Sequence, residues 1–185
     1  RLFLGKVKVS TANAAAVAEL ADRCALTPGP SAHTRKVAAK RGWKVEWLLH
    51  GDLNDMLMID TDNERDRPWW KGWFVDDFTA HLSRRDTIGC CVRWGDECLG
   101  YAIYRLEPER IELVRLAVQP DFHRQGIGAA LVAKLANKLS HDRRKSLQLW
   151  VPEHALSAQL FLKACDFQGF PIGDGKIRFI RFQGA

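Results

Sequence analysis

Apolar and polar positions follow regular periods from about Trp43 to the end of the chain. Short apolar or alternating runs bounded by turn residues predict strands, and apolar positions three and four residues apart predict helices. The predicted strands cover residues 44–49, 87–93, 98–106, 111–118, 147–151, 167–172 and 177–182. The predicted helices begin at Leu53 and at about Val75, and then cover residues 129–139 and 155–165. The order is a strand, two helices, a meander of three strands, a helix, a strand, a helix and a hairpin, which is an α/β arrangement.

The first 42 residues follow a different pattern. A short strand could cover residues 2–9, and a helix could run on to Cys24. Residues 27–31, with the sequence Thr-Pro-Gly-Pro-Ser, then break any regular structure. We therefore divide the chain into an N-terminal extension, residues 1–42, and a domain, residues 43–185, and expect the extension to be peripheral to the chemistry.

The strongest functional signal is a buried strand, a tight turn and a glycine-opened helix in residues 114–129. The strand is mostly apolar, and Pro120, which lacks an N–H group, ends its hydrogen-bond ladder. Gly126 and Gly128 open the helix and let a ligand approach the backbone closely. The first amides of a helix have no partner within it, and the macrodipole adds partial positive charge there. This helix start therefore predicts a site for a phosphate or pyrophosphate.

The spacing of the glycines excludes two common phosphate sites. A P-loop needs Gly-Lys-Ser/Thr at its end, and no such sequence follows Gly128. A dinucleotide fingerprint needs a third glycine, but Leu131 stands at that position. The remaining alternative without a ligand is an ordinary strand, turn and helix whose glycines serve packing.

Residues His123 to Gly128 resemble the acyl-CoA signature of the GNAT superfamily of N-acetyltransferases, which is Gln/Arg-x-x-Gly-x-Gly/Ala, with His123 at the first position. The element order over residues 43–183 is also that of the GNAT fold. Within the superfamily, Pro68-Trp69 between the first two helices resembles the RimI-like, ribosomal-protein-alanine N-acetyltransferases. The resemblance implies a central mixed twisted sheet with helices on both faces, in which a splayed pair of strands holds CoA.

The resemblance also implies acetyl-CoA as co-substrate, with no metal. The strand would pair with the pantetheine arm, the amides of the helix start would surround the pyrophosphate, and an amide near Val118 would bind the thioester oxygen. The implied CoA-binding residues are Leu116, Ala117, Val118, Arg124, Gln125, Gly126, Ile127, Gly128 and Ala129.

The acid and base of the RimI-like group are absent. Trp150 stands where that group has a Glu, and Leu162 stands where it has a Tyr. Glu112 is our candidate general base, because it aligns with the base of histone-type members. Strand alternation predicts that Glu112 shares a face with Val114, Leu116 and Val118. Alternatively, Glu112 is an exposed charge paired with Arg110 or Lys176.

Several other side chains flank the expected site. Glu153 and His154 could accept the proton, although we favour helix-capping roles for them. His123 is expected to face the phosphates. Trp69 and Trp70 are expected to line the entrance for the amine, or else to pack their loop onto the core.

Composition narrows the class of protein. The 185 residues carry a net charge of +6, with 46% hydrophobic residues, which suits a globular domain that binds a polyanion such as CoA. Basic clusters occur without a nucleic-acid-binding signature, so no specific nucleic acid is expected. Five cysteines without a C-x-x-C pair indicate reduced thiols and a cytoplasmic location. We expect no membrane partner, and a monomer or homodimer.

Three functions are compatible with this sequence. The first is an N-acetyltransferase whose preferred acceptor is a protein N-terminus, because an α-amine with a pKa near ~8 deprotonates more easily than a lysine near ~10.4. The second is an acetyltransferase for small-molecule amines, which acids such as Asp76, Asp77 and Glu153 would favour. The third is a non-catalytic GNAT module that binds acyl-CoA, which the missing Tyr and Glu would favour.

Overall fold

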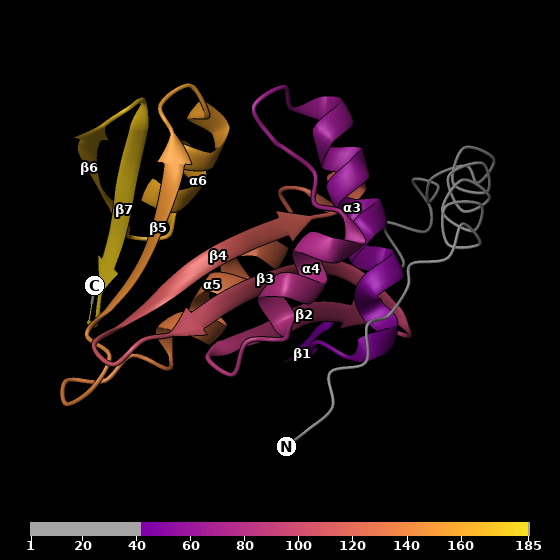
Figure 1. The fold of residues 1–185 in the computed structure, drawn as a ribbon, viewed down its shortest axis with the longest axis horizontal. Helices are drawn as coiled ribbons and strands as arrows, with labels where there is room; N and C mark the ends of the chain where they lie inside the picture. The colour runs from indigo at the N-terminus through magenta and orange to yellow at the C-terminus, as the bar shows by residue number, and fades with distance from the viewer. Residues whose placement is uncertain (1–41, 185) are drawn as a thin grey trace, which may run out of the picture.

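A computed structural model describes residues 42–184, and its strands form one mixed sheet (Figure 1). In the described residues the strand order is β1-β2-β3-β4-β5-β7-β6. The strands are β1 (Lys44–Trp47), β2 (Thr87–Trp94), β3 (Glu97–Leu106), β4 (Arg110–Val118), β5 (Ser146–Pro152), β6 (Gln168–Gly173) and β7 (Lys176–Phe182). The α-helices are α3 (Leu53–Asp66), α4 (Val75–Leu82), α5 (Ile127–Ala136) and α6 (Leu156–Ala164). The element order and fold class expected from the sequence are both present.

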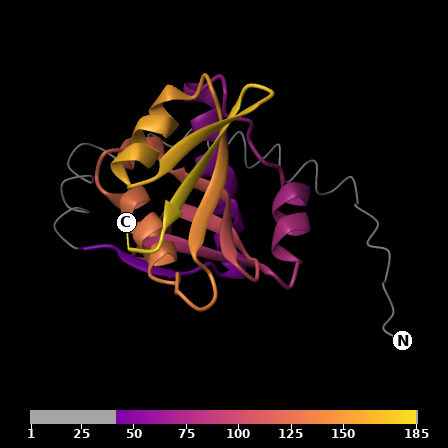
Figure 2. The same cartoon turned by 90° about the vertical axis from the view of Figure 1, so that its left-hand side faces the viewer.

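Helices cover both faces of the sheet, as Figure 2 shows with α4 and α6 on opposite sides of the strands. Met56 and Ile59 of α3 and Phe78 of α4 pack with Tyr101 and Ala117 on one face. The other face holds the larger core, whose buried members come mainly from β2 to β5, α5 and α6. From β2 to β4, each sheet face is therefore buried under apolar helix surfaces, which is the main stabilising term of such a domain.

A β-bulge in β4 changes which side chains share a face. Ile103 pairs with Arg115 and Tyr104 pairs with Leu113, so Val114 is the extra residue. As a result Leu113, Leu116 and Val118 all pack into the α5 core, whereas Val114 packs into the α3 and α4 core. Glu112 lies on the α3 and α4 face with Val114, and the expectation that it shares a face with Leu116 and Val118 was wrong.

Several element boundaries differ from the sequence prediction. Helix α5 covers Ile127–Ala136 instead of 129–139, because left-handed Gly126 serves as its N-cap and Asn137 caps its end. Strand β1 ends at Trp47, two residues before the expected end, whereas α4 has the expected bounds. The described cysteines, Cys90, Cys91, Cys98 and Cys165, are buried and free, and Cys24 and the rest of residues 1–41 lie outside the described residues.

Candidate functional site

The parallel strands β4 and β5 separate along their length, as Figure 1 shows from their common start. They pair only at Arg110–Ser146, Ile111–Leu147 and Glu112–Gln148. Beyond Glu112, β4 continues to Val118 with β3 on one side and no β5 partner on the other. This opening is the splay that the family resemblance implied, and it exposes one edge of β4 in the middle of the sheet.

The backbone N–H and C=O groups of Leu116 and Val118 point into this opening. The N–H of Gln119 donates to the carbonyl of Leu99 in β3, at 2.9 Å. Because hydrogen bonding alternates along an antiparallel strand, Ala117 also faces β3, while Leu116 and Val118 direct their backbone groups toward the splay. These N–H groups are donors that a ligand in the splay could use.

The carbonyl of Val118 already has two donors. Asn63 of α3 donates to it from Nδ2 at 3.0 Å, and His123 contacts it from Nε2 at 2.8 Å. Since a carbonyl only accepts, His123 donates through Nε2, and its Nδ1 can accept from Arg67, 3.2 Å away. Burial lowers the pKa of His123, and the bond to Val118 opposes that shift. The expectation that His123 faces phosphates is replaced by this role in holding the Val118 peptide.

The turn before α5 presents a row of amides. Arg124 has a φ of 62° and Gly126 a φ of 85°, so the backbone curls around the helix start. The N–H of Ala130 donates to the carbonyl of Gly126 at 2.9 Å. In the described part of the chain, the amides from Gln125 to Ala129 have no backbone acceptor, as the geometry of a helix start requires. Such concave amide groups bind anions.

The two glycines of this turn have different structural roles. At Gly126, the left-handed backbone strains most other residues, although a Cβ there would meet no atom within 4 Å. At Gly128, a Cβ would lie 3.1 Å from the ring of Phe161 in α6. Gly126 therefore shapes the amide row, and Gly128 allows α6 to approach the start of α5.

On the other face of β4, a buried ionic network supports the loop between α3 and α4. Asp60 of α3 is 1% exposed and forms an ion pair with Arg115 of β4. It also accepts hydrogen bonds from the hydroxyl of Tyr101 and from the backbone N–H of Trp73, the latter at 2.8 Å. Burial raises the pKa of Asp60, and Arg115 opposes that shift. The network connects α3, β3, β4 and the loop at one point.

The tryptophans of this loop surround Arg115. Its guanidinium lies 4.1 Å from the ring centre of Trp70 and 4.6 Å from that of Trp73. Trp69 contacts Trp70 edge to face at 5.9 Å and packs against the α5 core. The indole N–H of Trp70 is buried without a partner in the described residues. Trp70 thus lies over Arg115 of β4, and Trp69 packs against the core that Leu116 and Val118 also join.

Glu112 lies at the closed end of the splay. Its carboxylate forms an ion pair with Arg105 of β3 at 3.1 Å, and 15% of its side chain is exposed. The ion-pair partner of Glu112 is thus Arg105, and not Arg110 or Lys176 as the alternative expected. Burial raises the pKa of Glu112, and Arg105 opposes that shift. Glu112 faces the same side of the sheet as the Trp70 loop, so the structure brings the candidate base and this candidate acceptor wall to one face.

The remaining candidates have simpler surroundings. Glu153 and His154 are exposed, and α6 has Ala155 as its N-cap with no side-chain cap, so neither residue caps the helix. Trp150 is 40% exposed on β5, whereas Leu162 is buried in the core. No described helix is long and apolar enough to cross a membrane. No group of three metal-ligating side chains was found among residues 42–184.

Sequence reasoning missed Asp60, Asn63 and Arg115. A signal for the first two exists, because Met56, Ile59, Asp60 and Asn63 follow helical spacing and are all buried on one face of α3. An acid and an amide in line with an apolar face indicate polar partners inside the fold. Arg115 offers a similar signal, since it is a charge within a mostly apolar central strand.

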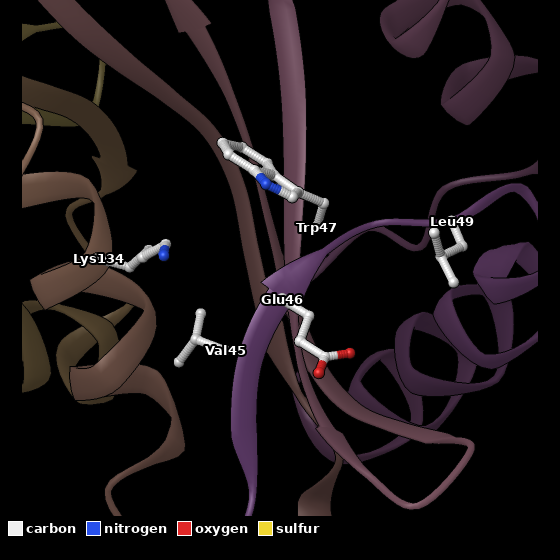
Figure 3. Close-up of a pocket in the computed structure, with 5 residues that line it drawn as sticks. All are labelled: Val45, Glu46, Trp47, Leu49 and Lys134. Atoms are coloured by element: carbon white, nitrogen blue, oxygen red, sulfur yellow. The ribbon is translucent and has the colours of Figure 1, made fainter.

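A surface hollow of about 400 Å³ lies at the far edge of the sheet (Figure 3). Val45 and Trp47 of β1 point toward α5, from which Lys134 comes, while Glu46 points away. Glu46 pairs instead with Arg93 at 3.3 Å. The hollow contains no residue of the splay or of the amide row.

Comparison with known proteins decides the family. Residues 53–167, more than half of the chain, match the model of the acetyltransferase (GNAT) family. The chain belongs to the GNAT acetyltransferase family. A search of curated proteins found no match.

Solved structures share the GNAT fold at low sequence identity. The ribosomal-protein-S18-alanine N-acetyltransferase of Escherichia coli has a TM-score of 0.65 and 19% identity, over 78% of this chain and 96% of that one. The PaiA N-acetyltransferase of Thermoplasma acidophilum, solved with coenzyme A, has a TM-score of 0.63 and 12% identity, over 76% and 99%. Arabidopsis thaliana NAA60, solved with acetyl-CoA, has a TM-score of 0.61 and 15% identity, over 78% and 100%.

Proposed function

We propose that this GNAT protein transfers the acetyl group of acetyl-CoA to a primary amine, and that the preferred acceptor is the α-amine of a protein N-terminus. The observation that carries the proposal is the opening of β4 from β5 after Glu112, with the N–H groups of Leu116 and Val118 directed into it. One structural neighbour is named as a ribosomal-protein-alanine N-acetyltransferase, which supports the class of acceptor. Another was solved with acetyl-CoA, which supports the choice of donor.

The residues present fit CoA. The amide row of Gln125 to Ala129 would hold the pyrophosphate, with Arg124 adding positive charge. Leu116, Ala117 and Val118 would offer β4 as a strand edge to the pantetheine arm. The N–H of Val118 would donate to the thioester oxygen, because Asn63 and His123 fix the carbonyl of that residue.

Acetyl-CoA supplies an activated acyl carbon, and the chain must supply the route for a proton. A base first takes one proton from the ammonium group of the acceptor. The free amine nitrogen then bonds to the acyl carbon, the carbon–sulfur bond breaks, and CoA leaves as the thiol with the second proton of the amine. Glu112 is the carboxylate that we assign to this step, because it lies on the acceptor face at the closed end of the splay. It stands six residues before Val118, about 20 Å along an extended strand, so it would take the proton through a chain of waters. Trp70, with Trp69 beside it, would form the wall on which the acceptor lies.

The test is a panel of amines incubated with the full chain and acetyl-CoA, with thiol release and product mass as readouts. The proposal expects peptides with a free α-amine to be the best acceptors. Faster turnover with polyamines or aminoglycosides would identify a small-molecule enzyme. CoA binding without transfer to any amine would identify a non-catalytic module.

Glu112→Gln is expected to lower kcat by at least about tenfold, because general-base catalysis contributes typically ~10²–10⁴-fold. Activity needs the carboxylate form, so the rate of the wild type should fall as the pH drops through the raised pKa of Glu112. The variant should lose that acid limb and keep its affinity for CoA. Glu109→Gln, at an exposed position in the preceding turn, is the matched control. An unchanged pH–rate profile in Glu112→Gln would remove Glu112 from the mechanism.

Trp70→Ala is expected to raise the apparent KM for the acceptor roughly 2- to 10-fold, the equivalent of an aromatic contact of about 0.5–1.5 kcal/mol. The KM for acetyl-CoA should stay near the wild-type value, because Trp70 lies on the α3 and α4 face of β4. Trp70→Phe keeps a ring over Arg115, so its KM for the acceptor should be closer to the wild-type value than that of Trp70→Ala. Trp47→Ala, in the remote hollow, is the control. Equal changes in both KM values would show that Trp70 only packs the loop.

Three expectations from the sequence stay proposals. The domain of residues 43–185 is proposed to carry the whole activity, with residues 1–42 as an extension. A cytoplasmic location, and a monomer or homodimer, also stay predictions. The proposal needs no metal, no membrane and no nucleic acid as a partner.

A further inference from the structure

The open face of the C-terminal part of the sheet carries a row of three side chains. Trp150 of β5 pairs with Arg178 of β7, and Arg178 pairs with Phe170 of β6. Residues in register across neighbouring strands point to the same face. The other face of these strands is the one that packs into the α6 core, through Leu149, Ile177 and Phe179. Trp150, Arg178 and Phe170 therefore point away from α6.

The two rings of this row are exposed, Arg178 between them is half-buried, and the charge of Arg178 is not neutralised. Trp150 is 40% and Phe170 is 39% exposed. Among residues 42–184, no carboxylate lies within ion-pair distance of Arg178. Its Nε is buried and lacks a hydrogen-bond partner in the described structure. A guanidinium keeps its charge at neutral pH, and its planar donors match a carboxylate.

The row borders the candidate site. Trp150 lies two residues beyond Gln148, the last residue of β5 that pairs with β4, so it stands on the rim of the splay. Arg178 is one strand further, which places it at least about 10 Å, or two interstrand spacings, from β4. An extended peptide covers that distance in roughly three residues.

We propose that Arg178 binds a carboxylate of the acceptor, so that the preferred substrate is a peptide with an acidic side chain about three residues after its free α-amine. The inference rests on the proposed function, because it places the amine at the splay. Trp150 and Phe170 would bound the peptide on either side of Arg178. The apolar rings and the unpaired cation select an acidic segment over a basic one, because a lysine beside Arg178 would meet a like charge.

The experiment measures peptide binding by calorimetry, with the full chain saturated with CoA so that binding does not depend on turnover. The peptides have a free α-amine and carry a single Glu at the second, third, fourth or fifth position, or Gln at the same place. We expect one Glu peptide to bind roughly tenfold tighter than its Gln counterpart, in the range of a hydrogen bond to a charged group. Arg178→Gln should remove that preference, and Arg178→Glu should transfer it to a Lys peptide. Lys163→Gln, an exposed charge on α6, should leave the preference unchanged.

Equal binding of every Glu and Gln pair, binding of none of them, or a preference that survives in Arg178→Gln, would overturn the inference. The same peptides are then tested for acetyl transfer by the wild type. Selective binding without transfer would count against the proposed function and leave the carboxylate site standing. Acetyl transfer to these peptides without a preference for Glu would support the proposed function and overturn the carboxylate site.

Discussion

Gly126→Asp is expected to abolish CoA binding while the fold persists. Gly126 has a left-handed backbone, and asparagine and aspartate tolerate that conformation better than other residues with a side chain. A Cβ there meets no atom within 4 Å, so the new side chain has room beside the amide row. Gly126→Asn is therefore a matched control, since it adds the same shape without the charge.

The difference between these two variants measures the anion site directly. Two like charges about 4 Å apart repel by about 4 kcal/mol at an effective dielectric constant of 20. Calorimetric titration with CoA should thus show at least about 100-fold weaker binding for Gly126→Asp than for Gly126→Asn. Similar affinities for the two variants would mean that the pyrophosphate does not lie at the start of α5.

Asp60→Ala is expected to lower the free energy of unfolding by about 3–5 kcal/mol, the usual cost of removing one partner of a buried ion pair. The change leaves Arg115 without its carboxylate, and it leaves the hydroxyl of Tyr101 and the N–H of Trp73 without an acceptor. Asp76→Ala, an exposed acid in α4, should change stability by less than about 0.5 kcal/mol. Urea denaturation of both variants is the measurement.

Asp60→Asn separates the charge from the hydrogen bonds. Its amide oxygen can still accept a hydrogen bond from the N–H of Trp73. If that bond matters, Asp60→Asn should lower the free energy of unfolding by less than Asp60→Ala does. A loss below about 1 kcal/mol for Asp60→Ala would show that the network adds little beyond an exposed pair. It would also remove the argument that this network fixes the Trp70 loop on β4.

Local patterns in the sequence were enough to predict most of the fold. The strands, helices and hairpin are in the expected order. Each element buries one face, so its apolar residues repeat about every two residues in a strand and about every 3.6 residues in a helix. The ends of the elements were less accurate. Helix α5 begins at Ile127 because left-handed Gly126 ends the turn, which is a property of the backbone and not of side-chain periodicity.

The candidate site was predictable where it is a local motif and not where it is assembled from distant residues. The turn before α5 is continuous in sequence, so its amides and glycines were expected. The bulge at Val114 has no local signal, and it turned Leu116 and Val118 to the face opposite Glu112. Asn63 meets Val118 and Asp60 meets Arg115 across 55 residues of chain, so only the packing of α3 on β4 brings them together.

A crystal structure with acetyl-CoA bound tests the central claim most directly. We predict the pantetheine arm between β4 and β5, the thioester oxygen on the N–H of Val118, and the pyrophosphate on the amides of Gln125 to Ala129. A cofactor bound anywhere else, or a splay that stays free of it at saturating acetyl-CoA, would contradict this account.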